Sequence, residues 1–387
     1  MSDSTMSSLA SELRALEKRV KDSFEPADFS HLRKIERIGR IFTILGFASA
    51  WTGINPASAF AISLGIFTRW LVMHHVNHQG YDQVPGVPER YTSPVFAQGW
   101  RRFVDWFDWI LPAAWAYEHN TLHHYHTGEE LDPDQVEINT DFLREMRAPK
   151  FFKLIILTII ACTWKFTYYA PNTIGCLDPK TLKRRKKDDI KPIGFSELLS
   201  FHRADVRRLW RSCYLPFGLF HFALIPALFL PLGTEAALFV LINRILAEFM
   251  TNVHSFLVIG PNHTGSDIHR FDHHFKTADD FYRMQVLGTA NYITGREWVD
   301  YLQIYLNYQV EHHLFPKLPM RRYREIQPEV KAICLKYDLP YIEENVFYRL
   351  YRMARVCIGI DSMKFVSESD HVQALKRVDA DSLSQAS

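Results

Sequence analysis

Nine of the eighteen histidines in this chain occur in three short clusters, and each cluster lies beside a long apolar segment. Imidazole nitrogen is a ligand for iron, zinc, copper and nickel. A single histidine rarely binds a metal, but three such clusters are typical of a metal site at a membrane surface. The clustered residues are His74, His75 and His78, then His119, His123, His124 and His126, and finally His312 and His313.

The spacing within each cluster predicts that several nitrogen atoms point toward one centre. Side chains four residues apart lie on one face of a helix, and each cluster contains such a pair. A tetrahedral zinc site takes four ligands, whereas these clusters offer at least eight, so the count favours two metal ions. The pairs are His74 with His78, His119 with His123, and Gln309 with His313, and His124 and His312 are adjacent to them.

Several other histidines are expected outside the set of ligands. A histidine next to a ligand often supports it or faces solvent, which is the expectation for His75 and His126. An H-x-x-x-H-H pattern formed by His269, His273 and His274 is expected at the surface or beside the ligands. Four histidines stand alone and are expected to be ordinary hydrogen-bonded or solvated side chains: His31, His202, His221 and His371.

The composition is that of a protein with a membrane part and a large aqueous part. The chain has 387 residues, of which 47% are hydrophobic and 14% aromatic, yet its mean hydropathy is slightly negative. The formal charge of +2 gives no argument for nucleic acid, and the basic residues form no stripe interleaved with aromatic residues. The five cysteines show no C-x-x-C spacing and are predicted to be reduced packing residues.

Four apolar segments are long enough to cross a bilayer, which takes about 20 mostly apolar residues. A fifth apolar segment, 151–170, contains two lysines and two tyrosines and is predicted to lie at the membrane interface. Arg244 and Glu248 lie four residues apart in the last span and are predicted to form a structural pair. The predicted spans form two hairpins, 38–54 with 57–74 and 213–232 with 235–259.

The histidine clusters can share a centre only if they lie on one side of the membrane. Counting segment 151–170 as a span would separate the third cluster from the first two. With that segment at the interface, the basic residues of 33–40 and 180–187 fall on one side, which the positive-inside rule assigns to the cytoplasm. We therefore predict an all-α integral membrane protein with four transmembrane helices in two hairpins and a helical cytoplasmic cap that carries the site. The predicted divisions are a polar segment 1–35, a membrane domain 36–365 and a disordered tail 366–387.

The clusters resemble the histidine boxes of the membrane-bound di-iron fatty acid desaturases, whose patterns are H-x(3–4)-H, H-x(2–3)-H-H and [HQ]-x(2–3)-H-H. The stretch Asn307–Pro316, which reads N-Y-Q-V-E-H-H-L-F-P, is very similar to the front-end acyl-lipid branch of that family. Asp132-Pro133-Asp134 after the second box also matches that branch. The resemblance covers roughly residues 60–345.

The resemblance implies a di-iron centre with dioxygen as co-substrate. The family has a further histidine just past the fourth span, in a segment resembling N-H-x-G that Asn262–Gly265 matches, so His263 is the expected ligand and His254 the alternative inside the span. The ligands implied in this way are His74, His78, His119, His123, His124, His263, His312 and His313. Residues expected as further ligands or as supports for the imidazoles are Gln309, His75, His254, Asp132, Asp134 and Glu311.

Two departures from the front-end branch limit what the resemblance implies. Many of its members carry a fused haem domain with an H-P-G-G signature, which this sequence lacks, so a separate electron donor is expected, either a ferredoxin or a cytochrome b-type protein. Box two has three residues between His119 and His123, where the branch commonly has two. The position of the double bond is therefore left open.

The activity implied is insertion of a cis double bond into a fatty acyl chain or lipid, in a bacterial inner membrane or the endoplasmic reticulum. A di-iron hydroxylase or ketolase would use the same boxes, and its products would gain oxygen rather than lose hydrogen. A histidine-rich metal transporter is the alternative from another class. Transporter ligands lie near the bilayer midplane, whereas these clusters lie at or beyond the ends of the spans.

Overall fold

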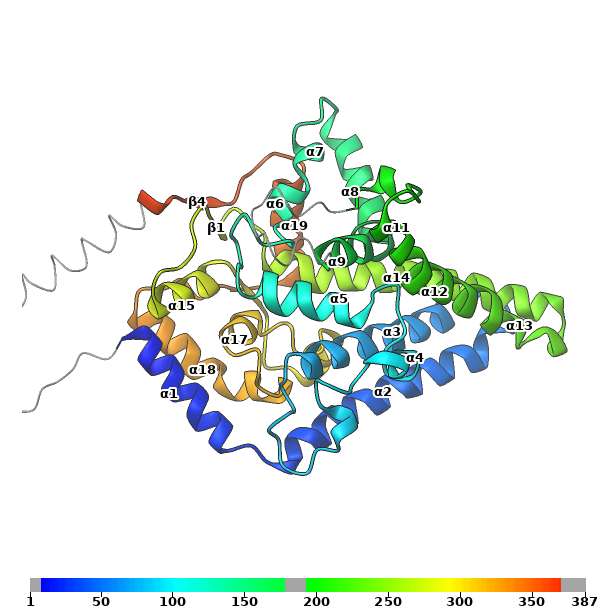
Figure 1. Ribbon diagram of the computed structural model, residues 1–387, viewed down its shortest axis with the longest axis horizontal. Coiled ribbons are helices and arrows are strands. Elements are labelled where there is room, and N and C mark those ends of the chain that lie inside the picture. Colours follow the sequence, from blue (N-terminus) through cyan, green and yellow to red (C-terminus); the bar gives the residue numbers. More distant parts are fainter. Residues whose placement is uncertain (1–7, 178–192, 370–387) are drawn as a thin grey trace, which may run out of the picture.

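Two proline residues begin the first pair of long helices, α2 (Pro26–Ala50) and α3 (Pro56–Asn77). Proline fits the first turn of a helix because its missing N–H needs no partner there, and the Asn55 side chain caps α3 by accepting a bond from Ala57 N. The two helices pack side by side as a hairpin (Figure 1). The computed structural model describes residues 8–177 and 193–369, which are mostly helical.

Glycines let α2 and α3 approach closely. A Cβ atom on Gly65 would collide with the Thr43 side chain and lie 2.8 Å from the Gly39 carbonyl oxygen. Small residues at such positions bring helix backbones together in membranes, where packing rather than hydrophobic expulsion drives association. The hairpin that carries the first histidine cluster therefore depends on these glycines.

We expect Gly65→Ala to lower the free energy of unfolding by about 1–3 kcal/mol, because the added methyl overpacks the interface between α2 and α3. Thermal unfolding in detergent measures this loss. Gly218→Ala is the control, since among the described residues a Cβ atom there meets nothing within 4 Å. An equal melting temperature for both variants would contradict the close packing.

A long helix, α14 (Thr234–Ile259), packs against α3 and against α8 (Lys150–Trp164). Asn243 of α14 holds the turn of the first hairpin, because its amide donates to the carbonyls of Ala50 and Gly53 and its oxygen accepts from Asn55 N. The predicted pair of Arg244 with Glu248 is confirmed at 2.9 Å. Helix α8 continues through η4 (Lys165–Tyr169) into α9 (Ala170–Cys176).

Within the described residues, four helical stretches are long and apolar enough to cross a membrane: Pro56–Asn77, Lys150–Cys176, Ala204–Leu232 and Thr234–Asn262. The number agrees with the prediction, but the set differs in one place. Lys150–Cys176, which includes the segment predicted at the interface, meets the requirement of length and composition, whereas α2 is not among the four. The division of the chain into spans and domains thus stays a prediction.

The cap lies at the opposite end of the molecule from α13 (Ile225–Ala227) (Figure 1). Two parallel pairs of very short strands tie it together: β1 (His269–Phe271) pairs with β4 (Lys364–Val366), and β2 (Asn291–Tyr292) pairs with β3 (Glu343–Glu344). Its longer helices are α1 (Leu9–Asp22), α15 (Ala278–Leu287), α17 (Gln309–Leu314), α18 (Met320–Lys336) and α19 (Val346–Cys357).

The remaining elements are short. They are η1 (Glu89–Tyr91), η2 (Gly99–Arg101), α4 (Arg102–Asp105), α5 (Pro112–Tyr117), η3 (Glu118–His123), α6 (Val136–Asn139), α7 (Asp141–Arg144), η6 (Phe195–Glu197), α11 (Ala204–Leu209), η7 (Trp210–Tyr214), α12 (Leu215–Leu219), η8 (Phe220–Leu224), η9 (Leu230–Leu232), η10 (Gly260–Asn262) and α16 (Glu297–Leu302).

The prediction of a helical membrane protein is confirmed, with the two strand pairs as small additions to the cap. The basic run at 180–187 and most of the predicted tail lie outside the described residues, as do residues 1–7 of the predicted N-terminal segment.

Candidate metal centre

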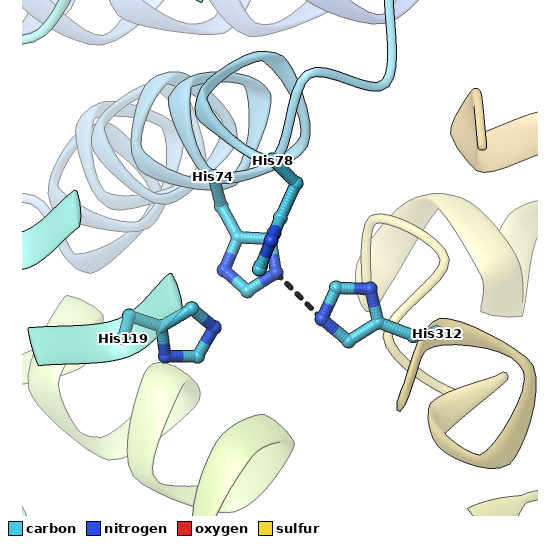
Figure 2. A group of neighbouring side chains, drawn as sticks. All are labelled: His74, His78, His119 and His312. Carbon is cyan, nitrogen blue, oxygen red and sulfur yellow. Dashed lines mark hydrogen bonds between the residues drawn. The ribbon is translucent and has the colours of Figure 1, made fainter. Parts of the chain in front are cut away.

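Four buried histidines from three distant parts of the chain converge on one point (Figure 2). His74 and His78 project from the end of α3, His119 from η3 and His312 from α17. Their candidate ligand atoms all lie within 4.8 Å of one another, and the Nε2 atoms of His74 and His312 are 3.0 Å apart. This arrangement can hold one metal ion in a pocket of imidazoles.

A second group of histidines lies directly beside the first. His123, His263 and His313 have their candidate ligand atoms within 4.8 Å of one another, and so do His124, His312 and His313. His124 lies between the two groups, because its ring centroid is 4.2 Å from that of His313 and 4.5 Å from that of His78. The arrangement thus has room for two adjacent ions.

A π turn explains how the second histidine cluster serves both groups. η3 is a π helix, in which His124 N donates to the His119 carbonyl five residues earlier at 3.0 Å. Such a turn inserts one residue into the helix and rotates the residues after it, and it occurs frequently at functional sites. The ring centroids of His119 and His124 are thereby 4.8 Å apart, and those of His119 and His123 are 5.1 Å apart.

The histidine nitrogens at this centre fit a metal because many have no other partner. Within the described part of the chain, both ring nitrogens of His119 and of His124 are buried without a hydrogen bond, as are His78 Nε2 and His313 Nε2. Burying a polar atom without a partner costs free energy, so several such atoms around one point fit the binding of a cation.

Burial also keeps these imidazoles in the form that binds metals. Removal from water and the neighbouring imidazoles together lower the pKa of His119, His124, His312 and His313 well below the usual range. Burial lowers the pKa of His263 to about 3. Neutral imidazole offers a free lone pair, so the centre is ready for a metal at neutral pH.

Partners on the outer side of the rings orient three of these histidines. His123 Nδ1 donates to Asp132 Oδ1 at 2.8 Å, and His313 Nδ1 donates to Gln285 Oε1 at 2.9 Å. His312 Nδ1 lies 3.2 Å from the Tyr323 hydroxyl. Each contact leaves Nε2 directed at the centre. Burial opposes protonation of His123, but the Asp132 carboxylate outweighs it and raises the pKa of this imidazole.

We expect Asp132→Asn to weaken metal binding by about 10–100-fold without unfolding the protein, because such outer partners fix the tautomer and direction of a ligand. Metal content after dialysis against a graded chelator measures the loss. The exposed carboxylate of Asp141 provides the control variant Asp141→Asn, which should retain its metal. Equal retention in both variants would show that Asp132 does not orient a ligand.

The other residues singled out from the sequence divide into two sets. Asp134 lies with His119 and His123, and burial raises its pKa to about 6. Gln309 lies between Asn262 and His263, accepting a bond from the Asn262 amide at 3.0 Å and donating to His263 Nε2 at 2.8 Å. Both residues are therefore placed to support the centre.

Three candidates bond elsewhere. His75 Nε2 donates to the Ile304 carbonyl at 2.8 Å, and His254 Nε2 donates to the Leu302 carbonyl at 2.8 Å. The Glu311 carboxylate accepts from Asn291 and Tyr341 instead of an imidazole, and burial raises its pKa to about 7. The structure thus brings His263 to the centre, places the His75 ring next to that of His74, and directs His254 to Leu302 and Phe67 instead.

The isolated histidines for which the structure gives a partner bond away from the centre. His31 Nε2 bonds the Tyr305 hydroxyl, and His221 Nδ1 accepts from Arg244 Nε. His269 of the H-x-x-x-H-H pattern also bonds elsewhere, through Nδ1 to the Leu287 carbonyl. His371 lies outside the described residues. Three supporting residues are not indicated by the sequence pattern: Gln285, Tyr323 and Asn291. Asn262, by contrast, can be recognised in the sequence, because it is the first residue of the N-H-x-G segment.

A cavity of about 600 Å³ opens beside the histidines. Its inner end is formed by the buried rings of Trp70 and Trp115 next to His74, His119, His123 and His263. Its outer part is lined by Phe142, Ile159 and Phe195, which are 56%, 58% and 71% exposed. An apolar passage therefore leads from the surface of α8 to the candidate metal centre.

Comparison with known proteins decides the family. The sequence profile described as "Fatty acid desaturase" matches residues 49–345, which include every histidine of the two groups. The chain belongs to the fatty acid desaturase family.

This desaturase is similar over most of its length to enzymes of stated activity. It is 26% identical over 367 residues to the NADPH-dependent stearoyl-CoA 9-desaturase of Mycobacterium tuberculosis, covering 88% of this chain and 76% of that one. It is 23% identical over 315 residues to the acyl-lipid (8-3)-desaturase of Mortierella alpina, covering 80% and 61% of the two chains. A shorter match of 69 residues, 38% identical, covers 18% of this chain and 15% of the Delta(8)-fatty-acid desaturase of Helianthus annuus.

The family and these relatives confirm the activity expected from the histidine boxes. The protein is a membrane fatty acid desaturase, and therefore an oxidoreductase that acts on a lipid or acyl substrate. The two histidine groups are its candidate metal site.

Proposed function

We propose that the desaturase holds two iron ions, one in the group of His74, His78, His119 and His312 and one in the group of His123, His263 and His313, with His124 between them. The adjacency of the two groups, together with their unpartnered buried nitrogens, carries this proposal. Bound iron would activate dioxygen so that hydrogen can be abstracted from an unactivated methylene. No side-chain base can remove that hydrogen, because it is not acidic.

The acyl chain of the substrate lies in the cavity beside α8. The walls near the opening are apolar, and Trp70 and Trp115 close the inner end where the histidines begin. Rings packed around the chain exclude water from the reacting carbons and fix which of them faces the centre. The product is a cis double bond at the carbons held there.

Electrons reach the centre from a separate protein, a ferredoxin or a cytochrome b-type protein. The chain contains no H-P-G-G signature of a fused haem domain. The mycobacterial relative is named NADPH-dependent, which indicates a reductant supplied from outside that enzyme.

The centre lies on the cytoplasmic side of a bacterial inner membrane or the endoplasmic reticulum. Three of the candidate spans lie between His78 and His263, and an odd number of crossings would put these residues on opposite sides. The His78 ring contacts that of His124, which contacts that of His313, which in turn contacts that of His263. Since His78 and His263 thus belong to one centre, an even number of the segments between them crosses the membrane. This supports an interfacial position for Lys150–Cys176. The basic residues of 33–40 then flank the first predicted span on the cytoplasmic side.

Expression of the chain in a host should produce a new unsaturated fatty acid, and the His313→Ala variant should not, because His313 belongs to two of the histidine groups, one with His123 and His263 and one with His124 and His312. Gas chromatography with mass spectrometry identifies the product and locates its double bond. Hydroxylated chains instead would establish a di-iron hydroxylase. Metal transport into vesicles without any need for dioxygen would overturn the proposal.

A further inference from the structure

Outside the two groups just described, one more set of metal-binding side chains meets near the surface. His126 Nδ1 lies 2.8 Å from Glu129 Oε2, and His274 Nδ1 lies 2.7 Å from Glu129 Oε1. The ligand atoms of the three residues all lie within 4.8 Å of one another. Two imidazoles from distant parts of the chain thus face the two oxygens of one carboxylate.

The burial of this set is that of a built site rather than a solvated cluster. His126 and Glu129 are buried, and only His274 is exposed, with 40% of its side chain accessible. The Tyr125 ring lies 5.1 Å from each of the two imidazole rings, and the Phe275 ring lies 4.0 Å from that of His274. Aromatic rings thus pack against both imidazoles of the set.

We propose that His126, Glu129 and His274 form a third metal site, which takes a divalent transition ion such as Zn²⁺ or Co²⁺ from solvent. Two imidazole nitrogens and a carboxylate oxygen are the ligand set of three-coordinate protein sites that keep a fourth position for water. Ligands bound about 2.0–2.2 Å from such an ion lie roughly 3.3–3.5 Å apart at tetrahedral angles. The present contacts of 2.7 and 2.8 Å would have to open by roughly 0.5–0.8 Å.

The site connects two segments that border the proposed iron centre. Glu129 pairs with Phe271 in an isolated β-bridge, and Phe271 N donates to the Gly128 carbonyl at 2.8 Å. Gly128 N in turn donates to Asp132, the carboxylate that orients His123. A metal bound at the third site therefore links two segments: the loop that contains Asp132 and the strand that precedes His274.

Binding of Co²⁺ to the full chain, purified in detergent with its iron in place, tests the site. Equilibrium dialysis with metal analysis should find one Co²⁺ per chain in addition to an unchanged iron content, with the visible absorption of tetrahedral Co²⁺. His274→Ala and Glu129→Gln should each weaken this binding at least about tenfold. Co²⁺ should also raise the melting temperature of the unaltered chain and not that of the variants.

His269→Ala is the matched control, because His269 belongs to the same H-x-x-x-H-H pattern but bonds the Leu287 carbonyl. It should retain the Co²⁺. Equal uptake by the unaltered chain and His274→Ala, no uptake by either, or uptake only at the expense of iron would each overturn the proposal. In those cases Glu129 is simply a hydrogen-bonded carboxylate between two imidazoles.

Discussion

The His263→Ala variant should lose desaturation entirely and retain fewer than two iron ions per chain. His263 lies in the group with His123 and His313, its ring 4.7 Å and 4.6 Å from theirs, and the Gln309 amide holds it in place. Replacement by alanine removes one of three imidazoles from that group and adds no other ligand. The second ion should therefore be lost first.

His254→Ala is the control for this experiment, since His254 is the other histidine near the end of the fourth span. Its Nε2 already donates to Leu302 O and its ring stacks on Phe67 at 4.0 Å. This variant should keep both iron ions and its activity while losing about 1–3 kcal/mol of stability from an unmade buried hydrogen bond. Iron analysis of the two purified proteins decides the assignment. Iron loss in His254→Ala with full iron in His263→Ala would reverse it.

The convergence of the boxes can be predicted because each box lies on a short helical segment with its own spacing. His74 and His78 share a face of α3 whatever the rest of the chain does, and His312 and His313 are adjacent on α17. Local geometry thus determines which nitrogens point together. The boxes then meet on one side of the membrane provided that an even number of the apolar segments between them crosses it.

The supports of the imidazoles cannot be predicted in the same way. Gln285 comes from α15 and Tyr323 from α18, and each reaches its histidine through tertiary packing. Neither residue type is specific for such a role, and no spacing relates it to a box. Asp132 is recognisable because it comes shortly after box two, whereas Glu311, which is also acidic and lies inside box three, bonds Asn291 and Tyr341.

Composition is also insufficient to predict where the segment Lys150–Cys176 lies relative to the membrane, because its charged residues alone would indicate exposure to water. Lys153 Nζ donates to the carbonyls of Arg144 and Ile358, and Lys165 Nζ lies 2.7 Å from Asp108 Oδ2. Both ammonium groups are buried inside the protein with their partners. A lysine whose ammonium group is buried with hydrogen-bond partners in this way says nothing about how deep its helix lies in the membrane.

The Ile160→Trp variant should shift desaturation to shorter acyl chains and lower the rate on longer ones by roughly 5–150-fold. Ile160 is half-buried and lines the same cavity as Trp70 and Trp115, which lie next to the histidines. An indole there fills space that a long chain needs, and overfilling a packed passage costs about 1–3 kcal/mol, which corresponds to roughly 5–150-fold in rate.

Ile155→Trp provides the matched control, because Ile155 lies on the same helix, is 40% exposed and does not line the cavity. Product profiles from cells fed saturated acids of graded length compare the two variants directly. If both give the products of the unaltered chain, the acyl group does not pass Ile160. If only Ile160→Trp changes the length of the acyl chains that react or the position of the double bond, the cavity wall determines how far the reacting carbons lie from the end of the acyl chain. The regiochemistry of this desaturase is then set by the shape of the passage beside α8, because the histidines that hold the metal are fixed on other elements.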